Sequence, residues 1–166
     1  MEGLDIGIAG LRLVVGALVV GHGLGNLFGW FGGFGLDGTG AIFERLGLRP
    51  GRALAGVAGV VELGAGALLV AGLATPLAGA ALVGLMVTTI RTAHRGKGPW
   101  YFNGGWEYNV TLLTVGAALA FTGPGDLSVD HALDLRPGTT GWGVAALVVG
   151  LASGVGALAT RTGEAP

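Results

Sequence analysis

Two polar residues, His22 and Glu62, interrupt long apolar stretches of the sequence and are the groups best suited to chemistry. Glu62 lies near the middle of the apolar segment 53–73, and His22 lies near the end of the apolar segment 6–28. A carboxylate at mid-bilayer costs on the order of 2.5–3.5 kcal/mol, so it calls for a partner or a role. A buried carboxylate and an imidazole nearer the surface can together exchange protons with a small molecule. We therefore take Glu62 and His22 as the candidate catalytic pair.

A structural explanation is also open for each of these residues. Glu62 can form an ion pair with Arg12 or remain a neutral, hydrogen-bonded acid. The rest of its helical stripe is very small, which predicts that Glu62 faces a closely packed helix and not lipid; the stripe is Ala55, Gly59 and Gly66. His22 can be an ordinary polar group at a helix end. The glycines at positions 21, 23 and 25 equally allow a helix or a flat ligand to approach its ring.

A second set of polar and aromatic residues stands at the start of the apolar segment 107–122. Helical spacing predicts a polar face opposite His22, formed by Glu107, Thr111, Thr114 and Ala118. The threonine hydroxyls can equally bond back to their own helix. The aromatic residues of 28–34 are typical of an interfacial belt, and His94, in a basic loop, is expected to be solvated. The candidate ligand-binding residues are Arg12, His22, Glu62, Trp106, Glu107, Tyr108 and Thr111.

The composition places these residues in a membrane. Of the 166 residues, 51% are hydrophobic and 11% are charged, whereas soluble domains have about 25% charged residues. The 36 glycines lie among Leu, Val and Ala, as in closely packed membrane helices. The net charge of −1 argues against nucleic-acid binding, and the absence of cysteine excludes thiolate chemistry by this chain. The sequence predicts one membrane domain over residues 1–166.

Five apolar segments are long enough to cross a bilayer as helices or nearly so. They are residues 6–28, 53–73, 77–90, 107–122 and 142–160. Between the first two, the pattern Thr39, Ile42, Phe43, Leu46 and Gly47 predicts a short capped helix at the interface. Thr75-Pro76 predicts a tight turn that opens the third helix. The acidic loop 123–141 is expected outside the hydrocarbon.

The basic residues predict the orientation of this all-α membrane protein. Seven of the nine lie on one side of the five predicted spans: Arg45, Arg49, Arg52, Arg91, Arg95, Lys97 and Arg161. By the positive-inside rule that side is cytoplasmic, with the N-terminus outside and the C-terminus inside. The helical rise then places Glu62 near the midplane and His22 about 9 Å nearer the cytoplasm.

Several motifs together resemble the DoxX family of small bacterial membrane proteins. They are Gly21-His22-Gly23 with the following residues 27–33, residues 43–48, Glu62, residues 73–76 and residues 104–108. The motifs extend over roughly residues 10–125, and the family-like core is expected over residues 6–125. The resemblance implies a four-helix transmembrane bundle in the bacterial inner membrane, so the fifth span at 142–160 is an addition.

The resemblance also implies a redox-associated role, because a related subunit occurs in a thiosulfate:quinone oxidoreductase and other members are linked to quinone or catechol stress. It supplies no catalytic residues, so whether the chain is itself a quinone-linked enzyme stays open. Our hypothesis is a membrane subunit or binder of a quinone-like molecule near His22 and Glu62. We expect no covalently bound cofactor and no metal, since the histidines lie in separate segments and Cys-x-x-Cys-His is absent.

Two alternatives belong to other functional classes. A structural scaffold would recruit a partner redox enzyme, or a second copy of the chain, through glycine-rich faces such as Gly150-xxx-Gly154. A small proton-coupled transporter would also need a mid-membrane carboxylate, but such proteins usually contain inverted repeats, and the sequence shows no clear repeat.

Overall fold

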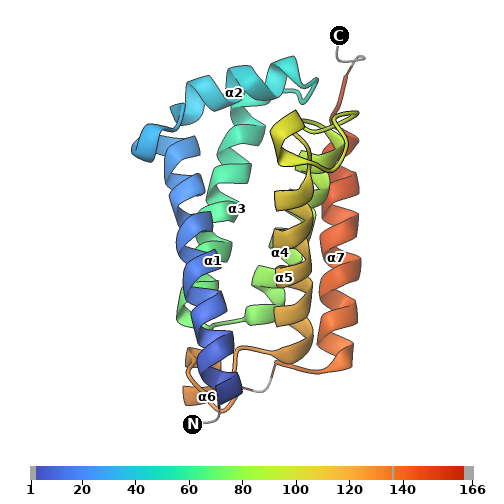
Figure 1. The fold of residues 1–166 in the computed structure, drawn as a ribbon. Coiled ribbons are helices and arrows are strands. Elements are labelled where there is room, and N and C mark those ends of the chain that lie inside the picture. Colours follow the sequence, from blue (N-terminus) through green and yellow to red (C-terminus); the bar gives the residue numbers. More distant parts are fainter. Residues whose placement is uncertain (1–2, 136, 163–166) are drawn as a thin grey trace.

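The computed structural model describes residues 3–135 and 137–162, and within them the chain is built from helices. The α-helices are α1 (Gly3–Phe28), α2 (Gly35–Arg45), α3 (Gly51–Ala71), α4 (Thr75–Arg91), α5 (Glu107–Thr122), α6 (Val129–Ala132) and α7 (Thr140–Leu158). Short 3₁₀ helices occur at Trp30–Gly32 and Tyr101–Asn103. The five long helices run side by side, α2 lies across one end of the bundle and α6 lies at the other (Figure 1). The predicted all-helical fold is confirmed.

Three of the described helices are long and apolar enough to cross a membrane: α1, α3 and α7. Helix α4 is a shorter apolar helix. It begins at Thr75 with Pro76 in its first turn, as the Thr-Pro pair predicts. Helix α5 has the predicted bounds. Helix α2 begins four residues before Thr39, so Thr39 lies inside the helix and does not cap it.

Helices α1 and α3 pack closely because glycines remove the side chains between their backbones. A Cβ atom at Gly66 would lie 2.7 Å from the carbonyl oxygen of Gly16 and from the amide nitrogen of Val20. A Cβ atom at Gly23 would lie 2.9 Å from the carbonyl oxygen of Gly59. The small stripe on α3 therefore faces a neighbouring helix, as predicted, and that helix is α1.

Helices α4, α5 and α7 form a second closely packed group. A Cβ atom at Gly150 of α7 would lie 2.6 Å from the Ala80 oxygen of α4, and one at Gly154 would lie 3.0 Å from the Gly84 oxygen. The Gly150-xxx-Gly154 face is thus occupied by α4 of the same chain. The scaffold alternative therefore loses this face as its recruiting surface, because a glycine pattern does not identify which helix it contacts.

The chain closes the end of the bundle where its N-terminus lies (Figure 1) around two buried charged residues, Arg12 and Asp130. Arg12 Nη1 donates to the Leu69 oxygen at 3.2 Å, and its Nη2 donates to the Leu127 oxygen. Asp130 accepts hydrogen bonds from the backbone nitrogens of Ala74 (3.0 Å) and Thr75 (3.3 Å), at the start of α4. These contacts hold the loop after α5 against the α3–α4 turn.

Candidate ligand site at Glu62

Glu62 is held by a polar network that joins three helices. Its Oε2 accepts a hydrogen bond of 2.7 Å from Nδ2 of Asn26, near the end of α1. Thr39 of α2 donates in turn to the backbone oxygen and to Oδ1 of Asn26, each at 3.4 Å. Asn26 is thereby oriented so that its NH₂ group points at the carboxylate. Glu62 Oε1 has no hydrogen-bond partner among the described residues, and Glu62 is half-buried.

Two adjoining cavities lie between the α1–α3 pair and the group formed by α4, α5 and α7. The α7-side cavity has a volume of about 410 Å³ and reaches Ser153, Ala157 and Thr160. The α5-side cavity has a volume of about 260 Å³ and reaches Tyr108 and Asn109. Both are lined by His22, Glu62, Leu85 and Thr89. His22 and Glu62 therefore face a common space.

The cavity walls are mainly apolar and offer few free polar groups. The hydroxyls of Thr88 and Thr89 donate to the carbonyl oxygens of Gly84 and Leu85 on their own helix, each at 2.9 Å. His22 has no hydrogen-bond partner among the described residues, which leaves its ring and Glu62 Oε1 available to a ligand. In the described part of the chain no three His, Asp or Glu side chains gather as metal ligands. The arrangement suits an apolar molecule with one or two hydrogen-bonding oxygens.

His94 also reaches the site, from the loop after α4. The side chain is half-buried and lines the α5-side cavity, and its Nδ1 donates to the Gly104 oxygen at 2.6 Å. This hydrogen bond fixes the tautomer of the neutral ring and leaves Nε2 as an acceptor. The expectation that His94 is simply solvated was wrong, because the following loop folds back over the end of the bundle and supplies a carbonyl partner.

The structure brings together only part of the predicted ligand-binding set. His22, Glu62 and Tyr108 line the cavities, whereas Arg12, Trp106, Glu107 and Thr111 do not. Arg12 is bound to Leu69 and Leu127, so it forms no ion pair with Glu62 in this structure. Glu107 Oε1 accepts a hydrogen bond of 2.7 Å from the Tyr101 nitrogen.

The predicted polar face on α5 points outward. Thr111, Thr114 and Ala118 are exposed, and Thr111 Oγ1 donates to the Glu107 oxygen of its own helix at 2.9 Å. The prediction that this stripe lies opposite His22 was therefore wrong, and the alternative of hydroxyls bonded back to their helix holds for Thr111. The inward face of α5 carries Asn109, which is buried and donates to Sδ of Met86 at 3.5 Å.

Asn26 is the functional candidate that the sequence reasoning missed. A signal was present, because Asn26 follows His22 by one helical turn and therefore projects from a nearby face of α1. A polar residue in that position inside an apolar helix is a natural partner for a carboxylate on the adjacent helix. The sequence analysis named Arg12 as one alternative partner of Glu62 and a hydrogen-bonded acid as the other, without naming Asn26.

Comparison with known proteins is consistent with this architecture. The family model of DoxX matches residues 7–95, which is more than half of the chain and covers most of α1 and all of α2, α3 and α4. Neither the curated proteins nor the solved structures contain a match to this chain. Glu62, Asn26 and His22 all lie inside the matched segment, whereas α5 and α7 lie outside it. With its apolar helices and this match, the chain belongs to the DoxX family and is a multi-pass membrane protein.

Proposed function

We propose that this protein binds a quinone-like molecule in the space shared by the two cavities and exchanges protons with it through Glu62 and His22. The observation that carries the proposal is that Glu62, which has one carboxylate oxygen free of hydrogen bonds among the described residues, and His22 line both cavities between mainly apolar walls. A volume of about 410 Å³ lies within the range of about 300–1,000 Å³ that small-molecule pockets have. A flat ring with polar oxygens matches this lining.

The chemistry follows from the hydrogen-bonding capacity of each group. Ionised Glu62 can accept a hydrogen bond, and a proton, from a hydroxyl of the reduced ligand, while Asn26 holds its second oxygen. His22 can donate to a ligand oxygen or relay a proton towards the surface. Electrons would come from or go to a separate redox enzyme, so the chain acts as a quinone-binding, redox-associated subunit in this proposal.

We further propose that all five long helices cross the bacterial inner membrane, with the N-terminus outside. The support is the position of the basic residues at the end of the bundle where α2 and the C-terminal end of α4 lie. Alkaline phosphatase is active only outside the cytoplasm, so a fusion at Gly98 is expected to be inactive and one at Gly138 active. An active fusion at Gly98 would reverse the orientation.

Binding of menadione, a naphthoquinone without a tail, tests the proposed site. The purified protein in detergent is titrated with menadione, and bound ligand is measured by equilibrium dialysis. His22→Ala is expected to weaken menadione binding by about tenfold, because it removes the donor to a quinone oxygen in a largely apolar site. Menadiol, the reduced form of the same ring, carries the hydroxyl from which Glu62 accepts, so Glu62→Gln is expected to weaken menadiol binding by about tenfold. Asn26 holds Glu62 and makes no hydrogen bond to the ligand in this proposal. Asn26→Ala is therefore expected to lower the binding affinity less than the other two substitutions.

Matched controls exist for both substitutions. Glu44 and His131 lie outside the two cavities and are exposed. Glu44→Gln and His131→Ala are therefore expected to bind menadione and menadiol as the unmodified protein does. Equal affinities for Glu62→Gln, His22→Ala and these controls would refute the site, provided that helical content by circular dichroism is unchanged.

A further inference from the structure

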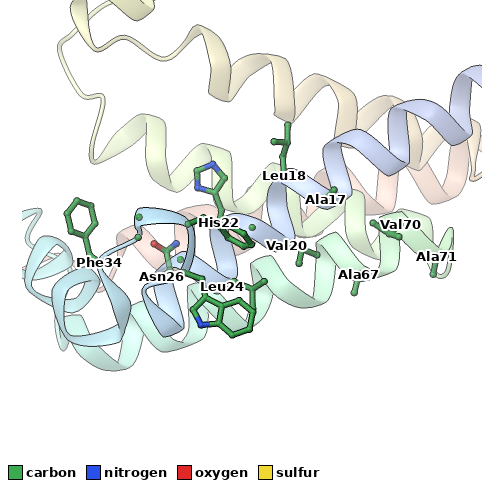
Figure 2. A pocket seen from close by; sticks show the side chains of 16 residues that line it. Ala17, Leu18, Val20, His22, Leu24, Asn26, Phe34, Ala67, Val70 and Ala71 are labelled. Atoms are coloured by element: carbon green, nitrogen blue, oxygen red, sulfur yellow. The ribbon is translucent and has the colours of Figure 1, made fainter.

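A third hollow lies on the outer surface of the α1–α3 pair and is much larger than the two inner cavities. It is a groove of about 990 Å³, and the loop with Trp30, Phe31 and Phe34 covers one end of it. Its floor is apolar: Leu18 and Val20 lie on α1, and Ala67, Val70 and Ala71 lie on α3 (Figure 2). In a bilayer this outer surface faces lipid.

The groove and the inner cavities share residues. His22 lines the groove and both cavities, and Asn26 lines the groove and the α7-side cavity. The side chains of His22 and Leu18, one helical turn apart, project from the same side of α1 (Figure 2). His22 is exposed although Glu62, in the same inner space, is half-buried. His22 thus stands where the inner space meets the lipid-facing groove.

The two inner cavities are small and the outer groove is large, which suits a ligand made of a ring and a long tail. The inner cavities, at about 410 and 260 Å³, suit a ring system, whereas a chain of several isoprene units needs an exit into an apolar environment. The outer groove is such an environment, and His22 is part of its lining.

We propose that the ligand of the Glu62 site is a ring with a long prenyl-type tail, which enters from the bilayer past His22 and leaves its tail in the outer groove. This inference rests on the proposed function, because it needs a ring bound beside Glu62. The occupant of the groove is then the tail of the bound ligand, and an independent phospholipid chain is the alternative that the experiment must separate.

The test compares menadione with the same ring carrying four isoprene units, in the full-length protein in nanodiscs. The readout is the affinity for the tailed ligand divided by the affinity for menadione. The concentration of each ligand is expressed as its mole fraction in the bilayer. Leu18→Trp places a larger side chain at the junction beside His22, and it is expected to lower the affinity for the tailed ligand relative to menadione by about tenfold. Leu11→Trp is the matched control, since Leu11 is exposed on the same helix and does not line the groove.

A second variant guards against misfolding of Leu18→Trp. A Cβ atom at Gly21 would meet nothing within 4 Å, so Gly21→Leu adds bulk inside the groove without disturbing the packing. It is expected to lower the same ratio, while Leu11→Trp keeps the ratio of the unmodified protein. If menadione binds and the ratio is unchanged in both groove variants, the tail does not lie in this groove and the inference is wrong, while the proposed function stands. If menadione does not bind the unmodified protein, the proposed function fails and this inference fails with it.

Discussion

Replacing Gly66 with leucine is expected to lower the free energy of unfolding by about 3 kcal/mol, because the new side chain cannot fit between α1 and α3. A Cβ atom there would lie 2.7 Å from both the Gly16 oxygen and the Val20 nitrogen, and 2.8 Å from a Val20 methyl group. Two of these three neighbours are backbone atoms, so only a separation of the helices can relieve the overlap. In a membrane, close packing of this kind supplies much of the attraction between helices.

The measurement is reversible unfolding from mixed micelles, followed by far-ultraviolet circular dichroism. Gly64→Leu is the matched control, since Gly64 lies on the same helix, is exposed, and would place a Cβ atom with nothing within 4 Å. Leucine favours a helix over glycine by about 1 kcal/mol, so Gly64→Leu is expected to be neutral or stabilising. Similar losses for both variants would show that the close α1–α3 contact is not a source of stability.

The helices could be predicted from the sequence because their signals are local. Apolar length sets the body of each helix, and Gly123-Pro124-Gly125 and Thr75-Pro76 mark where α5 ends and α4 begins. The stripe of small residues around Glu62 correctly predicted that a neighbouring helix packs closely against this face of α3. It could not predict that this helix is α1.

The partners of the polar residues depend on contacts far apart in the chain, and the sequence reasoning failed at these contacts. Arg12 is bound to a carbonyl 115 residues away, in a loop that had been predicted only as acidic and external. Helical spacing groups Glu107, Thr111 and Thr114 on one face but does not say whether that face points inward. Which face of α5 points inward depends on where α4 and α7 lie, and the sequence pattern within α5 cannot predict those positions.

The candidate site was predicted in part for the same reason. Glu62 and His22 were identifiable because polar groups are costly inside an apolar helix. Their common space arises from the way α1 and α3 stand apart from the second group of helices, which is a property of the whole bundle. Asn26 and His94 join the site only through that arrangement and through the loop that returns after α4.

Replacing Asp130 with alanine is expected to destabilise the protein by about 3 kcal/mol, because it removes three interactions in a buried setting. The carboxylate accepts hydrogen bonds from the backbone nitrogens of Ala74 and Thr75 and from the Thr75 hydroxyl. It also interacts electrostatically with Arg12, whose side chain is buried and whose Nε has no hydrogen-bond partner among the described residues. Without Asp130, α4 loses its N-terminal acceptor and Arg12 keeps a buried charge without a counterion.

A double variant separates the two contributions. If the uncompensated charge of Arg12 is the main cost, then Arg12→Met combined with Asp130→Ala is expected to be less destabilised than the sum of the single variants. Additive losses would instead assign the effect to the hydrogen bonds at the start of α4. Asp126→Ala serves as the control in the same loop, since the Asp126 side chain is 65% exposed and, among the described residues, forms an ion pair with the exposed His131 alone. The expected loss in the free energy of unfolding for Asp126→Ala is within about 1 kcal/mol. A loss as large as that of Asp130→Ala would show that the loop as a whole, and not the buried carboxylate, determines the stability of this end of the bundle.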